Sequence, residues 1–159
     1  MESGEIQSGA TDHCPFNYEK EKQMGKDDFT KCPNGAPGVE ERMILLFSEG
    51  VMKEKISINK LVEVACTNPA KVYGMYPKKG IIEPGSDGDL MIIDADQEQT
   101  LTHEMMHGAV DYTSYEGTPL KGKIDLVMQR GKVIAENNEF KGARGDGQYL
   151  HRKPYQGNL

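Results

Sequence analysis

The chain has 159 residues, enough for one ordinary domain, but only 36% are hydrophobic and 28% are charged, which is polar for a self-contained core. A net charge of −6 argues against nucleic acid or an anionic membrane surface as the main partner, and no apolar run approaches the roughly 20 residues that span a bilayer. The three cysteines, Cys14, Cys32 and Cys66, show no paired spacing, so we expect no disulfide framework and a cytoplasmic location.

The first candidate functional residue is Asp12, in the polar loop Ala10–Phe16, where we expect a short strand to end. A carboxylate in such a place can ligate a divalent metal ion and take a proton from metal-bound water. It can also accept hydrogen bonds from its own backbone in an Asx turn, and spacing alone does not decide between the two. His13 and Cys14 stand beside it, but adjacent side chains cannot easily converge on one ion.

Residues 17–38 show no sustained periodicity and are predicted to form a long loop, a kind of segment that is often functional. Its second half is rich in glycine and proline. Asn34-Gly35 and Pro37-Gly38 favour tight turns with positive φ at the glycines. Such a turn exposes backbone and amide groups that can bracket a small cyclic amide, and the alternative is an ordinary surface turn. Asn34 is therefore the second candidate residue.

Two helices are predicted next. The first begins at Val39, with acidic residues in its first turn, and the second begins after Ser57, which can cap it. Asn68 and Pro69 then restart a short helix that Gly74 ends. The apolar residues at helical spacing are Met43, Leu46, Phe47 and Val51 in the first helix and Ile58, Leu61, Val62, Ala65 and Cys66 in the second.

The pattern changes to strands after Pro77. Asp89–Asp94 is predicted to be a short apolar strand, and Ile124–Gln129 with Lys132–Ala135 a hairpin that turns at Arg130-Gly131. Asn137-Asn138 is the next predicted turn. The basic, glycine-rich tail that begins at Lys141 is predicted to lie over a neighbouring surface or to be loose.

His103-Glu104-Met105-Met106-His107 matches H-E-x-x-H, a helical zinc site with a glutamate general base. The motif requires a helix around both histidines, but Gly108 follows at once and a strand-like alternation begins at Val110. A zinc protease is therefore the third-ranked hypothesis.

Six segments, some of them described above, lie in order along nearly the whole chain: Thr11–Phe16, Pro33–Glu40, Asn68–Gly74, Gly85–Leu90, Asp111–Gly117 and Arg130–Val133. Together they resemble the hydantoinase/dihydropyrimidinase branch of the amidohydrolase superfamily. Six matches in sequence are far more specific than any one of them.

The resemblance implies an α/β fold, namely the C-terminal end of a (β/α)8 barrel with the C-terminal part of a small β-sandwich. Residues 1–76 would hold the last barrel strand, the substrate loop and the closing helices. Residues 77–140 would hold the share of the sandwich, and residues 141–159 a tail. Because the match begins at the last strand, we expect a C-terminal fragment that exposes strand edges and helix faces.

The resemblance also implies a zinc-dependent hydrolase that opens hydantoin or dihydropyrimidine rings. By similarity, Asp12 would ligate one of two zinc ions and carry the proton of the bridging hydroxide to the leaving nitrogen. Asn34 would hydrogen-bond the cyclic amide or imide, largely through its backbone. The family's histidine ligands and carboxylated lysine have no match here, so we expect the chain to need the missing N-terminal barrel portion as a partner. A homo-oligomer, a homotetramer, is implied as well.

A second hypothesis comes from the same resemblance. The family has relatives that keep the fold, lose the metal ligands and act as assembly proteins. The carboxylate of Asp12 favours the enzyme, because a scaffold has no need of it.

Overall fold

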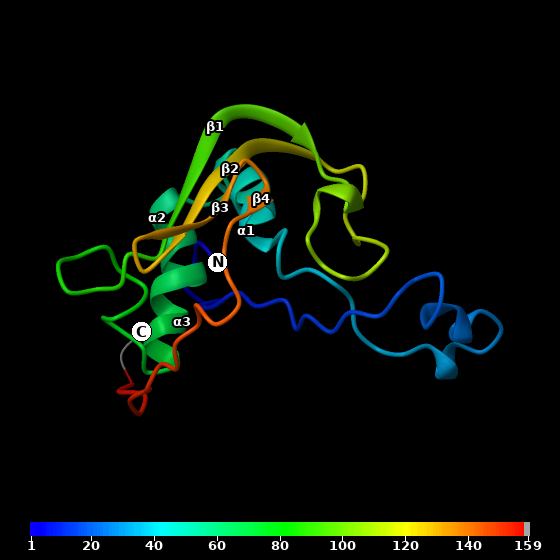
Figure 1. Cartoon of the computed structure of the whole chain (residues 1–159), viewed down its shortest axis with the longest axis horizontal. Coiled ribbons are helices and arrows are strands. Elements are labelled where there is room, and N and C mark those ends of the chain that lie inside the picture. The colour runs from blue at the N-terminus through cyan, green and yellow to red at the C-terminus, as the bar shows by residue number, and fades with distance from the viewer. Residues whose placement is uncertain (158–159) are drawn as a thin grey trace.

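The helices of this protein pack as one layer against one sheet, as the computed structural model of residues 1–157 shows (Figure 1). The last two residues of the predicted tail, 158 and 159, lie outside the described residues. No helix in the described part is long and apolar enough to cross a membrane.

The first helix is α1 (Arg42–Leu46), which continues into the wider π turn η3 (Phe47–Val51). Its predicted apolar face is confirmed, because Phe47 is buried and Met43, Leu46 and Val51 pack against the core. The predicted start at Val39 is three residues early. Glu40 and Glu41 lie in the turn just before α1, and the carbonyl of the cap residue Glu41 accepts the Leu45 N–H at 3.0 Å. Their carboxylates bind side chains of another loop.

The second helix joins α2 (Ile58–Val62), η4 (Glu63–Thr67) and α3 (Asn68–Val72). Ser57 caps it as predicted, because its Oγ accepts the Lys60 N–H at 3.0 Å. A short α-helix begins at Asn68 with Pro69 in its first turn, as predicted, but the predicted cap role of Asn68 is wrong. Asn68 has helical φ and ψ, its N–H reaches back five residues to the Glu63 carbonyl, and its buried side chain donates to Gln7 O at 2.8 Å.

A wider turn therefore carries the chain through Pro69 without a break. The helix ends at Gly74 (φ 67°), as predicted.

The strands form one antiparallel sheet in chain order: β1 (Leu90–Thr100), β2 (Pro119–Gln129), β3 (Lys132–Glu136) and β4 (Glu139–Phe140). The hairpin at Arg130-Gly131 and the turn at Asn137-Asn138 are confirmed, and positive φ at all four residues suits tight hairpin turns. β1 runs to Thr100, beyond its predicted end at Asp94. A register shift between Asp94 and Glu98 breaks the alternation there.

The hydrophobic core lies between the helices and the sheet. Its buried residues are Ile44, Phe47, Leu61, Ala65, Leu101 and Leu120. This core contains residues of both predicted parts, 1–76 and 77–140. The boundary between the two parts stays a prediction, and so do the barrel and the sandwich. An apolar groove of about 470 Å³ stays open between α2 and β1, with Ile58 and Ile82 exposed beside it. The predicted exposure of apolar faces is thus observed.

Residues 1–16 form no strand, so the strand predicted before Asp12 is wrong for the described chain. Within residues 1–157 the chain forms one sheet, made of strands between residues 90 and 140, and residues 1–16 are not part of it. Hydrogen bonds to the helices hold the extended segment instead, and one of them is the bond from Asn68 to Gln7 O described above. Gly9 N donates to Val64 O at 3.1 Å, and Arg42 Nη1 donates to Gly9 O at 3.2 Å.

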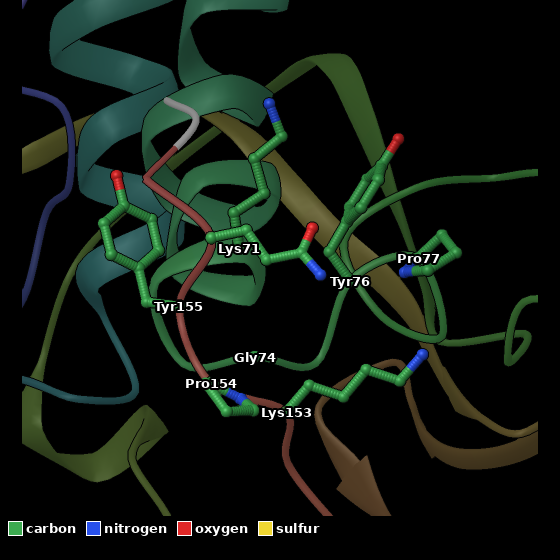
Figure 2. A pocket seen from close by; sticks show the side chains of 8 residues that line it. Lys71, Gly74, Tyr76, Pro77, Lys153, Pro154 and Tyr155 are labelled. Carbon is green, nitrogen blue, oxygen red and sulfur yellow. The ribbon is translucent and has the colours of Figure 1, made fainter.

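The tail lies over the chain's own surface. Lys132 Nζ binds the Asp146 carboxylate at 2.7 Å, and Lys153 N donates to Gly74 O at 2.8 Å. Figure 2 shows the hollow of about 420 Å³ that the tail encloses with the end of α3, lined by Lys71, Tyr76 and Tyr155 among others. Neither Asp12 nor Asn34 lines this hollow.

Gly122 gives the first test of the core. A Cβ at Gly122 (φ 104°) would lie 2.7 Å from Cε1 of Phe47, whereas Gly85 (φ 99°) has open space around it. We expect Gly122→Ala to lower the free energy of unfolding by about 3 kcal/mol, through backbone strain and overpacking. Gly85→Ala, which adds the strain alone, should cost about 1 kcal/mol. Urea unfolding followed by circular dichroism measures both, and equal losses would contradict the packing argument.

Candidate functional site

The two loops that carry the candidate residues lie side by side. Cys14 N donates to Ala36 O at 3.2 Å. The imidazole Nδ1 of His13 accepts the N–H groups of Gly38 at 3.2 Å and Val39 at 3.3 Å. Residues 10–16, which hold Asp12, are thereby bound to residues 32–40, which hold Asn34.

Close packing at Gly35 makes this approach possible. Gly35 has a φ of 117°, and a Cβ there would lie 2.4 Å from the carbonyl oxygen of Cys14 and 2.7 Å from its Cβ. The positive φ predicted for this turn is confirmed at Gly35, while Gly38 does not have it. A side chain at Gly35 would push the two loops apart.

Asp12 and Asn34 are both exposed at this junction. Asp12 has a φ of 48°, a left-handed conformation that aspartate tolerates better than most residues. Its carboxylate accepts no backbone N–H within residues 1–157, so the Asx turn is not observed. A carboxylate left free in this way is available to a proton, a metal ion or a substrate.

Lys22 is the residue that sequence reasoning missed here. Its Nζ donates to the carbonyl oxygens of Pro33 and Gly35, both at 2.6 Å, and lies 5.6 Å from the centre of the Phe16 ring. The two carbonyls flank Asn34. Because they belong to the backbone, no residue type in the sequence signals the contact.

The loop between β1 and β2 binds the residues that follow the turn around Asn34. The Glu40 carboxylate binds His107 twice, with Oε1 2.6 Å from Nδ1 and Oε2 accepting the backbone N–H at 2.8 Å. The other ring nitrogen, Nε2, lies 3.1 Å from the Asn138 carbonyl oxygen. Beside this pair, Thr113 Oγ1 donates to the buried Glu41 carboxylate at 2.8 Å.

A further carboxylate, Asp111, binds the start of residues 17–31. It accepts the N–H groups of Tyr18 at 2.6 Å and Glu19 at 3.0 Å, and these bonds lower the pKa of Asp111. The rings of Tyr18 and Tyr112 pack 5.8 Å apart alongside. Residues 17–31 are thus attached at their base to the β1–β2 loop.

The H-E-x-x-H segment does not form a metal site. The motif requires a helix that contains both histidines, but residues 103–107 form only one 3₁₀ turn, η5 (His103–Met105). His103 Nε2 lies 2.6 Å from Val110 O, while His107 binds Glu40, so the two imidazoles serve different partners.

Metal binding by this chain alone is not supported either. The part of the chain that the structure describes holds no group of three or more His, Cys, Asp or Glu side chains that could hold a metal ion. The free carboxylate of Asp12 fits the role of one ligand, and a complete site needs further ligands from elsewhere.

Residues 2–134 match the sequence model of the Amidohydrolase family. The chain belongs to this family. It is 45% identical over 155 residues to a D-phenylhydantoinase of Escherichia coli O1:K1 / APEC, a match that covers 98% of the chain and 34% of the relative. The resemblance to hydantoinases is confirmed, and this amidohydrolase segment spans about a third of the length of its curated relatives.

Solved structures agree. A crystal structure of D-hydantoinase superposes with a TM-score of 0.94 at 42% identity, over 97% of this chain and 34% of that one. The dihydropyrimidinase from Brevibacillus agri NCHU1002 superposes with a TM-score of 0.94 at 43% identity, over 97% of this chain and 33% of that one. The L-hydantoinase from Arthrobacter aurescens superposes with a TM-score of 0.89 at 37% identity, over 95% of this chain and 33% of that one. Hydantoinases named for opposite stereochemistry therefore share the fold of this segment.

The Glu40–His107 pair predicts a pH dependence. The hydrogen bond and negative charge of Glu40 raise the pKa of His107 above its ordinary value, outweighing partial desolvation. The pair therefore stabilises the fold fully below the ordinary histidine pKa of about 6.5, and this contribution is lost as the pH rises through the raised value. An NMR titration of the His107 ring should show the raised pKa in the native chain and a value near the ordinary one in Glu40→Gln.

Glu104→Gln is the matched control, because Glu104 is an exposed carboxylate of the same loop. Its substitution should leave the His107 titration unchanged. An identical titration in Glu40→Gln would contradict the assignment.

Proposed function

We propose that this chain supplies two parts of the active site of a cyclic-amide hydrolase of the D-hydantoinase/dihydropyrimidinase type, the proton-carrying Asp12 and the substrate loop around Asn34. The observation that carries the proposal is the junction of the two loops, which bear a free carboxylate and a glycine-rich turn. One backbone hydrogen bond and two bonds from backbone N–H groups to the His13 imidazole hold the loops together. The names of the relatives support the substrate class.

The reaction is hydrolytic ring opening. The oxygen of water bonds to the ring carbonyl carbon, and the carbon–nitrogen bond of the ring amide breaks. The Asp12 carboxylate takes the proton that the water loses and gives it to the leaving nitrogen. Exposed N–H and C=O groups of the turn around Asn34 pair with the ring amide and hold it in place.

Zinc is part of the proposal, with Asp12 as the one ligand from this chain. When bound, zinc lowers the pKa of water and stabilises a developing oxyanion. The remaining ligands would come from an N-terminal barrel portion, and we propose that the chain is inactive without it. Association with further copies, as a homo-oligomer, also stays a prediction.

The test uses the purified chain alone and mixed with the N-terminal part of the E. coli D-phenylhydantoinase. We expect bound zinc and the hydrolysis of hydantoin or dihydrouracil in the mixture only. Asp12→Asn should lower kcat at least about 100-fold, because the proton carrier is lost. Asp27→Asn, at another exposed loop aspartate, should leave the rate unchanged.

Other results would separate the alternatives. A mixture that assembles but shows neither zinc nor turnover would favour the non-catalytic assembly protein. Zinc bound by the chain alone, and lost in His103→Ala, would favour the H-E-x-x-H site.

A further inference from the structure

Lys22 stands on a segment that projects from the rest of the chain. Residues 17–31 extend away from the helices and the sheet (Figure 1), and their two 3₁₀ turns, η1 (Lys22–Gly25) and η2 (Phe29–Lys31), contain no buried residue. Such a segment gains little from hydrophobic burial. The half-buried side chain of Lys22 nevertheless returns to the substrate loop.

The contacts of Lys22 are specific. An ammonium group has three N–H donors, and two of them bind the carbonyl oxygens of Pro33 and Gly35 at 2.6 Å each. Charge-assisted bonds of this kind are about twice as strong as neutral ones. Lys22 forms no ion pair within residues 1–157, so no carboxylate competes for its charge.

The same ammonium group contacts the other loop. Its Nζ lies 5.6 Å from the centre of the ring of Phe16, four residues after Asp12. One side chain therefore links the segment that carries Asp12 to the turn that carries Asn34.

The bonds also affect the donors of the turn. The Pro33 carbonyl shares a peptide group with the N–H of Asn34, and the Gly35 carbonyl shares one with the N–H of Ala36. A cation at the oxygen end polarises a peptide group and makes its N–H a stronger donor. These N–H groups lie at the turn that we propose to bind the ring amide.

We infer that Lys22 is a positioning residue, which fixes the turn around Asn34 against the Asp12 loop and strengthens its backbone donors toward a cyclic amide. The inference rests on the proposed function for its catalytic consequence. Its structural consequence can be measured on the chain alone.

The first experiment is hydrogen exchange of the backbone amides. Lys22→Met keeps the length of the side chain and removes its donors, so the amides of Cys14, Gly38 and Val39 should exchange at least about tenfold faster. Lys26→Met removes an exposed lysine of the same segment and should leave these amides unchanged. Equal protection in the Lys22→Met chain would overturn the inference, whatever the activity.

The second experiment measures hydantoin hydrolysis in the mixture with the N-terminal part of the relative. Lys22→Met should raise KM about tenfold or more, with a smaller change in kcat, and Lys22→Arg should restore part of the loss because it keeps charged donors. A KM equal to that of Lys26→Met would overturn the positioning role. Absence of turnover with the unaltered chain would instead defeat the proposed function, and amide exchange would then decide the role of Lys22.

Discussion

The contact between Phe47 and Gly122 is the constraint on which the rest of this structure depends. The ring of Phe47 lies where a side chain on β2 would otherwise stand, so the first helix packs directly on the sheet. The neighbouring Ser48 Oγ accepts the Lys121 N–H at 2.9 Å, which satisfies a buried hydroxyl and fixes the position of the helix along the strand. The helix starts three residues after Val39, whose N–H binds His13, and its position therefore sets the position of the candidate site.

The site itself is held mostly by polar contacts to the backbone. His13 accepts two N–H groups, Lys22 donates to two carbonyls, and Asp111 accepts two further N–H groups at the base of the loop. Such bonds fix the path of the chain without covering it, which leaves the side chains of Asp12 and Asn34 exposed to solvent. In this segment the packed helices and sheet form the core, whereas the two hydrogen-bonded loops hold exposed side chains in place.

Features that depend on neighbouring residues in the sequence could be predicted, whereas contacts between residues far apart in the sequence could not. Ser57 and the Arg130-Gly131 turn depend on their immediate neighbours, and the sequence places both correctly. Asn68 was misread as a cap because its partner is Gln7, and the π turn that carries the helix past it has no residue signature. Lys22 was missed because its acceptors are carbonyl groups. Asp12 and Asn34 were candidates from the residue types of their loops, their roles were implied by the family resemblance, and those roles stay predictions.

Residues 23–30 also bear on how such a segment can diversify. Met24 is 62% exposed and Phe29 is 85% exposed, so neither contributes to the core. Substitutions at these two exposed positions cost little folding free energy, because loop positions without buried contacts tolerate change. Gly25 is different, since a Cβ there would lie 2.4 Å from the Cβ of Cys32. The exposed positions of the tip can therefore change without disturbing the core, while Lys22, at its base, keeps the two loops at a constant spacing.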